Sequence, residues 1–146
     1  EQMKPALTAD EAKTLNAVFY TAEKRLAKTP SLCESFALIF VFLDQPAMAV
    51  RLLEKRTISP TSDWLFAETL FLSHLHLQCL EQLAHIEKRY EHDGETPFAV
   101  LYLRAQCLWG LGEKDKALEM IRSLIRVRPL YRSAPALLQA WELDHA

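Results

Sequence analysis

Four side chains that could bind a metal ion lie close together in the middle of the chain: His74, His76, Cys79 and His85. The segment reads as helical, so residues 74 and 76 fall on different faces and cannot chelate one ion together. The sequence also has neither a Cys-x-x-Cys nor a His-Glu-x-x-His motif. We therefore predict no metal site and no cofactor.

Motifs for catalysis are missing as well. The sequence has no Gly-x-Ser-x-Gly elbow for a nucleophile and no glycine-rich loop for a phosphate. Its carboxylates mostly alternate with basic residues on what the pattern indicates is a solvated helix face, as in Glu81, Glu87, Lys88, Arg89, Glu91 and Asp93. We predict that the protein is not an enzyme.

One group of basic residues stands out, and two interpretations of it are open: Arg122, Arg126, Arg128 and Arg132. The group could bind an acidic protein segment, because guanidinium groups pair well with carboxylates. Alternatively it belongs to the last turn of a helix, where the helix dipole favours cations. Few aromatic residues are interleaved with it, so we expect no binding of nucleic acid.

Length and composition limit the architecture and the setting. The chain has 146 residues, of which 50% are hydrophobic, enough for one domain with a real core. Its 17 basic and 19 acidic residues give no overall field that would attract nucleic acid or an anionic membrane. No apolar run reaches the roughly 18 residues of a membrane span.

The cysteines indicate a reducing compartment. Cys33, Cys79 and Cys107 are odd in number, widely spaced and placed on apolar helical faces, so we expect buried thiols rather than disulfides. A cytoplasmic location follows as the expectation. Because the sequence begins at Glu1, a removed upstream segment, including a signal peptide, stays open.

Hydrophobic spacing predicts an all-α chain with three helical hairpins and an extra helix at each end, in one domain over residues 1–146. The expected ranges are a helix at 8–28, hairpins at 31–57, 62–92 and 96–128, and a helix at 133–144. Thr8 with Glu11, and Ser31 with Glu34, are predicted capping boxes. Residues 31–44 are apolar on nearly every side, so we expect their helix to be sandwiched between neighbours.

The clearest hairpin pattern runs from Thr96 to Arg132. Thr96 suits an N-cap and Pro97 the first helical position. Gly112 suits a turn with positive φ, and Pro129 ends the second helix. Apolar residues recur at helical spacing before and after that turn: Leu101, Ala105, Leu108, Leu111, Ala117, Leu118, Ile121, Leu124 and Ile125.

This pattern, over residues 98–131, resembles one tetratricopeptide repeat, a unit of about 34 residues. Arg104 and Leu124 depart from it, since the repeat has an apolar residue and an alanine there. Similar residues occur 68 positions earlier, which is two repeat lengths, and a middle unit fits between. At a 34-residue offset that unit is degenerate, because His74 and Glu87 fall on apolar positions, so we expect its second helix to be rotated or slipped.

The resemblance implies a right-handed stack of hairpins, a tetratricopeptide-like solenoid that binds other proteins. In that geometry certain first-helix residues face a concave groove: Tyr102, Gln106, Trp109, Glu68, Leu72, Glu34 and Leu38. A mostly apolar groove with an aromatic anchor and an acidic rim would suit an amphipathic helix or an extended apolar peptide. The alternative is that Trp109 and Tyr102 are covered by a terminal helix.

The function expected from this resemblance is protein binding without catalysis, by an adaptor or assembly subunit of a larger complex. The alternative is a small dedicated chaperone, resembling the repeat-containing chaperones of bacterial secretion systems, that shields an amphipathic client segment. A groove that reads a C-terminal carboxylate is disfavoured, because it would need basic residues where Glu34, Glu68 and Gln106 stand.

Overall fold

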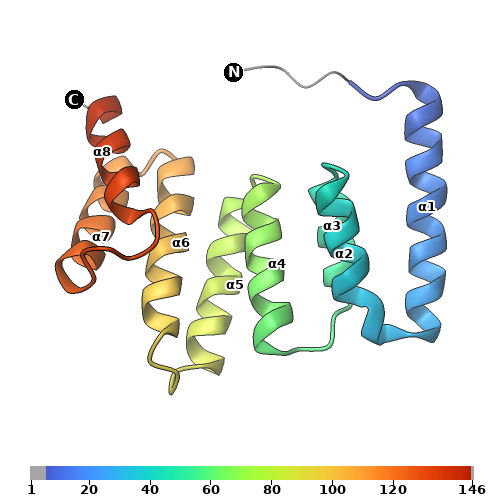
Figure 1. Cartoon of the computed structure of the whole chain (residues 1–146), viewed down its shortest axis with the longest axis horizontal. Helices are drawn as coiled ribbons and strands as arrows, with labels where there is room; N and C mark the ends of the chain where they lie inside the picture. Colours follow the sequence, from blue (N-terminus) through green and yellow to red (C-terminus); the bar gives the residue numbers. More distant parts are fainter. Residues whose placement is uncertain (1–5, 146) are drawn as a thin grey trace. The chain divides into compact units, whose positions relative to one another are not determined.

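The computed structural model describes residues 6–145, and over this range the chain consists of α-helices, one short 3-10 helix and connecting turns, without strands (Figure 1). The all-α prediction is confirmed. The chain divides between Thr57 and Ile58 into two compact units. We call them the first unit, which ends at Thr57, and the second unit, which begins at Ile58.

The first unit contains α1 (Ala9–Lys28), the 3-10 helix η1 (Pro30–Leu32), α2 (Cys33–Phe42) and α3 (Pro46–Leu53). Thr8 caps α1, since its Oγ1 accepts the Glu11 N–H at 3.1 Å. The predicted capping box of Ser31 with Glu34 is wrong. Pro30 starts η1 and places Ser31 inside it, so that α2 begins at Cys33 without a side-chain cap.

The helix α1 is held to its unit by few buried side chains. Of its residues, Phe19 and Ala22 are buried. The Phe19 ring meets the Phe40 ring edge-on at 5.6 Å, and the Arg51 guanidinium lies 4.5 Å from the Phe19 centroid. The contact between α1 and the α2–α3 hairpin is therefore small and centred on Phe19.

The expectation that α2 is sandwiched between neighbours is wrong. Its buried residues, Cys33, Ala37 and Phe40, form one stripe. Phe42 is 88% exposed, and the other apolar side chains that face solvent are Leu38, Ile39 and Leu43. An apolar surface on all sides does not by itself supply partners, and here the first unit covers only one side of α2.

The second unit contains α4 (Pro60–Leu72), α5 (His76–Arg89), α6 (Thr96–Gly110), α7 (Lys114–Val127) and α8 (Ala134–His145), and consecutive helices pack on each other. Figure 1 shows them following one another in chain order, from green to red. Thr96 is not the N-cap of α6, as predicted, but its first residue. Its N–H and hydroxyl both donate to Asp93 Oδ2, at 3.0 and 2.8 Å.

All three hairpins turn in the same way. Asp44, His74 and Gly112 have φ angles of 60°, 59° and 84°, in the left-handed region. The N–H after each of them donates to a carbonyl five residues back, in the pairs Gln45 to Phe40, Leu75 to Leu70 and Glu113 to Leu108, at 2.8–3.0 Å. This is a Schellman motif, which ends a helix with one left-handed residue. The turn predicted at Gly112 is confirmed.

The hairpins also share one internal register around that turn. At fixed offsets from the left-handed residue each carries the same fully buried positions: Ala37, Ala67 and Ala105, then Ala49, Cys79 and Ala117, then Leu53, Leu83 and Ile121. The Cys79 thiol donates to the Ala67 carbonyl at 3.2 Å, which shows how closely paired helices approach at these small residues.

The slipped middle helix predicted from the sequence is therefore wrong. From Asp44 to His74 is 30 residues and from His74 to Gly112 is 38, so the middle turn lies four residues earlier than a constant 34-residue period places it. Helix lengths explain the difference between these two spacings. The helices between the first two turns, α3 and α4, have 8 and 13 residues, whereas those between the last two turns, α5 and α6, have 14 and 15.

Replacing His74 with glycine is expected to stabilise the second unit by about 1 kcal/mol. A non-glycine residue in the left-handed region is strained by roughly 1–2 kcal/mol, part of which the greater chain entropy of glycine offsets. The matched control, Gly112→Ala, should destabilise the same unit by about 1 kcal/mol. Urea unfolding followed by tryptophan fluorescence measures both; destabilisation by His74→Gly would contradict this account of the turn.

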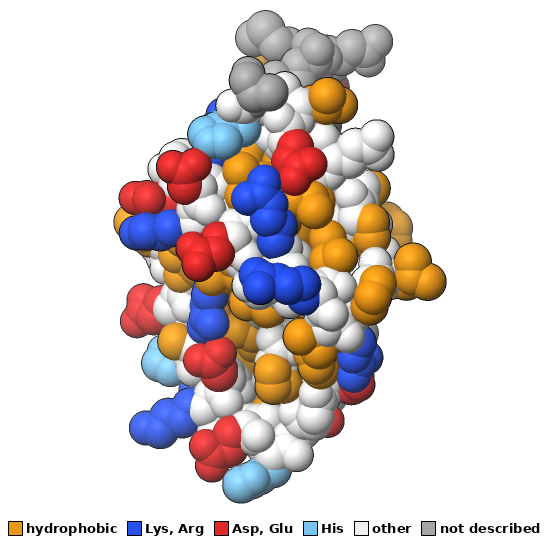
Figure 2. Space-filling view, turned by 90° about the vertical axis from the view of Figure 1, so that its left-hand side faces the viewer, with side chains coloured by type: hydrophobic (Ala, Val, Ile, Leu, Met, Phe, Trp, Pro, Cys, Tyr) orange, Lys and Arg blue, Asp and Glu red, His pale blue; other side chains and the backbone are white. Residues whose placement is uncertain are grey.

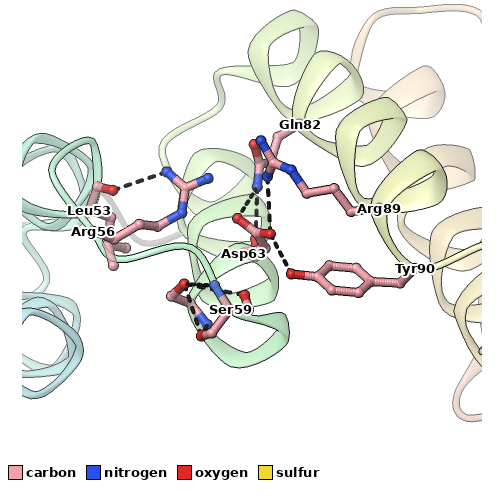
Figure 3. Close-up of polar contacts among 8 residues, drawn as sticks. Leu53, Arg56, Ser59, Asp63, Gln82, Arg89 and Tyr90 are labelled. Atoms are coloured by element: carbon pink, nitrogen blue, oxygen red, sulfur yellow. Dashed lines mark hydrogen bonds and ion pairs between the residues drawn. The ribbon is translucent and has the colours of Figure 1, made fainter.

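A buried carboxylate joins the first turn of α4 to the end of α5 (Figure 3). Asp63 is fully buried, and its Oδ2 accepts the Tyr90 hydroxyl at 2.8 Å and pairs with Arg89 Nη1 at 3.1 Å. Gln82 Nε2 donates to its Oδ1 at 3.3 Å. The helix dipole also favours a negative charge in the first turn. This network fixes α4, the helix that carries part of the site described next.

Candidate functional site

Trp109, expected as an aromatic anchor in an open groove, is covered by α8. Its ring stacks on the Trp141 ring with the centroids 4.7 Å apart and an angle of 5° between the planes. Lys114 Nζ also lies 4.9 Å from the Trp109 centroid. Of the two alternatives left open by the sequence, coverage by a terminal helix is the one that this arrangement matches.

Tyr102 and Gln106 are half-buried on the same helix. The Tyr102 ring meets the Tyr131 ring edge-on at 5.7 Å, in the segment that joins α7 to α8. Gln106 Nε2 donates to the Tyr102 backbone carbonyl at 3.3 Å, within α6 itself. Tyr102 thus takes part in the packing of α6 against the C-terminal segment, whereas the hydrogen bond of Gln106 stays within α6.

A groove of about 470 Å³ lies in the second unit beside these rings. It is bounded by α4, by the start of α6 and by the segment between α7 and α8. We call it the second-unit groove, and its lining residues are Trp64, Glu68, Asp93, Glu95, Thr96, Ala99, Tyr131 and Arg132. Of the residues predicted for a groove, Glu68 lines it, and Leu72 is exposed one turn further along α4.

The charge of this groove is mostly negative. Glu95 is engaged by Arg128, whose Nη2 and Nη1 donate to its two carboxylate oxygens at 2.9 and 3.3 Å, and this hydrogen bonding raises the pKa of Arg128. Asp93 accepts from Thr96, as described above. All three carboxylates are exposed, but among the described residues Glu68 alone of the three has no side-chain hydrogen bond or ion pair, so it is the one best placed to meet a ligand.

Two aromatic residues give the groove its apolar surface, and the sequence analysis missed both. Trp64 precedes Glu68 by one helical turn, so extending the predicted face of α4 by four residues would have found it. Tyr131 lies outside any helix, where periodicity gives no signal. Burial raises the pKa of Tyr131, and Arg132 lies 5.3 Å from its ring centroid.

The arginines proposed as a patch for an acidic partner have contacts within the second unit. Arg122 pairs with Glu142 at 3.0 Å, Arg128 pairs with Glu95, and Arg126 Nη2 donates to Ser123 Oγ at 3.4 Å. In Figure 2, which faces the α7 and α8 side, basic side chains lie beside acidic ones. Binding of an acidic partner stays a prediction, in competition with these pairs.

Glu34 and Leu38, the other two residues predicted for a groove, lie in α2 of the first unit. Glu34 is half-buried in the first turn of the helix, and Leu38 is 43% exposed.

The histidine cluster has a different geometry from the one expected. His74 lies in the turn rather than in a helix, so the statement that residues 74 and 76 point to different faces is wrong; their ring centroids are 5.9 Å apart. Burial, and then the nearby His74, lower the pKa of His76. Over residues 6–145 no group of three or more His, Cys, Asp or Glu side chains could hold a metal ion.

No helix among the described residues combines the length and the apolar character needed to cross a membrane.

Comparisons with protein-family models, with curated proteins and with solved structures find no match to this chain.

Proposed function

We propose that this protein is a non-enzymatic binding module of the tetratricopeptide type, an adaptor or assembly subunit that holds a segment of another protein in the second-unit groove. The repeat assignment is supported by the register that the three hairpins share. Each has small buried residues where its two helices approach and the same left-handed turn between them. Such units bury their faces by stacking, as α4 to α8 do.

The observation that carries the binding proposal is the combination of aromatic and acidic side chains around one open groove. Trp64 and Tyr131 offer apolar surface, and Glu68 offers an exposed carboxylate beside it. Aromatic residues contribute large contact areas at protein interfaces. A helical or extended segment with an apolar side chain and a neighbouring Lys or Arg complements this groove.

A second candidate function is that of a small dedicated chaperone for an amphipathic client segment. The specific observation in its favour is the amount of apolar side chain that faces solvent, with Leu130 89% and Val127 66% exposed next to the groove segment. Large exposed apolar patches mark interaction sites. We propose a cytoplasmic location for both candidates, and the support for it is that Cys33, Cys79 and Cys107 are buried free thiols.

The charge-reversal variant Glu68→Lys tests the groove. If the partner places a basic group there, the variant should lose about tenfold or more in partner affinity, because attraction becomes repulsion. Both the variant and the matched control Glu81→Lys, on an exposed position of α5, should keep the wild-type melting temperature. Partner recovery from the source cell, measured by quantitative mass spectrometry, gives the readout.

The identity of the recovered proteins separates the two candidates. A stable set of subunits that depends on Glu68 supports the adaptor, whereas one small, otherwise insoluble client supports the chaperone. Equal recovery with wild type and Glu68→Lys would contradict the use of this groove.

A further inference from the structure

The first unit has a groove of its own, of about 340 Å³, between α1 and α2. Its surface is almost entirely apolar, and the residues that matter here are Val18, Thr21, Ala22, Phe36, Ile39 and Phe40. Val18 and Ile39 are 45% and 48% exposed, so the groove is open to solvent. An apolar surface of this kind is favourable to cover, because covering it removes apolar area from water.

The face of α1 that lines this groove has opposite charges at its two ends. The face continues in steps of three and four residues through Glu11, Thr14, Val18, Thr21, Arg25 and Lys28. Asp10 adds a second carboxylate in the first turn, and Lys24 adds a third cation near the last turn, so that carboxylates outnumber Lys13 at the first end and cations outnumber Glu23 at the other. The groove therefore lies midway between an acidic end and a basic end.

Apart from Glu23, the charged side chains named above form no ion pairs among the described residues of the first unit. Among the ion pairs of the described residues, the one carboxylate of α1 that takes part is Glu23, which meets Arg51 at 3.9 Å and Lys55 at 3.7 Å on α3 and the residues after it. Lys24 lies over the Tyr20 ring at 4.6 Å, and no ion pair in this part of the chain involves Arg25 or Lys28. Both ends of α1 thus have charges available to a partner.

We infer that this face is an interface between two copies of the chain, with α1 of one copy lying antiparallel to α1 of the other and in contact with the other's α2. Antiparallel pairing brings the acidic first turn of each α1 to the basic last turn of the other. Val18, near the middle of the helix, then meets its own counterpart. Such an interface is isologous and closes on itself, so it forms a dimer and not a fibre.

The charge pattern favours a second copy over other occupants. The 20 residues of α1 extend over about 30 Å, so a helix of the same length is needed to meet both charged ends at once. A copy of α1 has that length, an apolar middle, and carboxylates and cations at the complementary ends. A helix that is basic along its whole length, or acidic along its whole length, would complement the charge at only one end of α1.

Sedimentation equilibrium on the intact chain, from about 1 to about 300 μM, tests this interface, because weak dimers dissociate in that range. We expect the wild-type mass to rise toward twice the 16.8 kDa of one chain. Val18→Asp places two carboxylates against each other and should weaken the dimer at least about tenfold. Lys24→Glu combined with Lys28→Glu should weaken it similarly.

Charge exchange supplies the decisive control. Adding Asp10→Lys and Glu11→Lys to the lysine-reversal variant restores opposite charges at each end and should restore most of the dimer affinity. The control Val127→Asp, at an exposed position of the second unit, should leave it unchanged. Circular dichroism verifies that each variant keeps its helix content. A monomeric wild type over the whole range, or a dimer indifferent to Val18→Asp and to charge reversal, would overturn the inference.

Discussion

Replacing Trp141 with alanine is expected to lower the free energy of unfolding of the second unit by about 3–5 kcal/mol, the usual cost of removing a buried tryptophan side chain. Trp141 is 7% exposed and belongs to the core cluster that joins α6, α7 and α8. Its loss leaves a cavity and removes the ring on which Trp109 stacks. The expected effect is among the largest in the molecule because α8 buries few other large side chains.

Urea unfolding followed by fluorescence measures this effect in the right part of the chain, since Trp64, Trp109 and Trp141 all lie in the second unit. Stacked aromatic pairs are worth about 0.5–1.5 kcal/mol beyond the area they bury, so a double-mutant cycle with Trp109→Ala should show coupling of that size. A Trp109→Ala variant that keeps full stability but no longer binds the partner protein would instead show that Trp109 contacts that protein.

The Asp63→Ala variant is expected to destabilise the second unit by about 2–4 kcal/mol, because it removes the carboxylate that accepts hydrogen bonds from Gln82, Arg89 and Tyr90. Gln82 is 4% exposed and keeps its hydrogen bond to the backbone carbonyl of residue 63, at 3.2 Å, so it loses only the bond to the carboxylate. Removing one hydrogen bond by Tyr90→Phe should cost about 1 kcal/mol.

A surface carboxylate gives the matched control for this network. Asp115→Ala, in the first turn of α7, removes an exposed group and should change stability by no more than about 1 kcal/mol. If Asp63→Ala costs as little as Asp115→Ala, as seen by the same fluorescence measurement, Asp63 does not hold α4 to α5.

The spacing of hydrophobic residues and the positions of proline and glycine were enough to predict the helices. The breaks at Pro30, Pro46, Gly112 and Pro129 divide the chain close to where the structure does. The repeated alanines at Ala37 and Ala105 also predicted the sites of close approach, because a small buried residue leaves a signature in both composition and spacing.

The middle hairpin could not be aligned from a constant period. Its left-handed residue is His74 instead of glycine, and that substitution hides the turn from a pattern that looks for Gly. Because α3 has only 8 residues, the middle turn lies four residues before the position that a constant 34-residue period gives. Backbone geometry is shared by the three turns although the residue types are not, so only the structure shows the common register.

The site was predicted less well than the fold, for a physical reason. Whether a residue on an apolar face lines a groove or meets another helix depends on where a later segment packs. Trp109 and Trp141 are 32 positions apart, and no local pattern links them. Tyr131, which closes the second-unit groove, lies in a non-helical segment between α7 and α8.

The most direct test of the central claim is site-specific photocrosslinking from the second-unit groove. A photoreactive amino acid placed at position 68 in the source cell should capture one defined segment of a partner, identified by mass spectrometry of the crosslinked peptide. That segment should contain an apolar residue next to Lys or Arg. The same amino acid at exposed position 81 of α5 should not capture it. Capture of the same peptides from both positions, or of none from position 68, would contradict the proposal that this groove holds another protein.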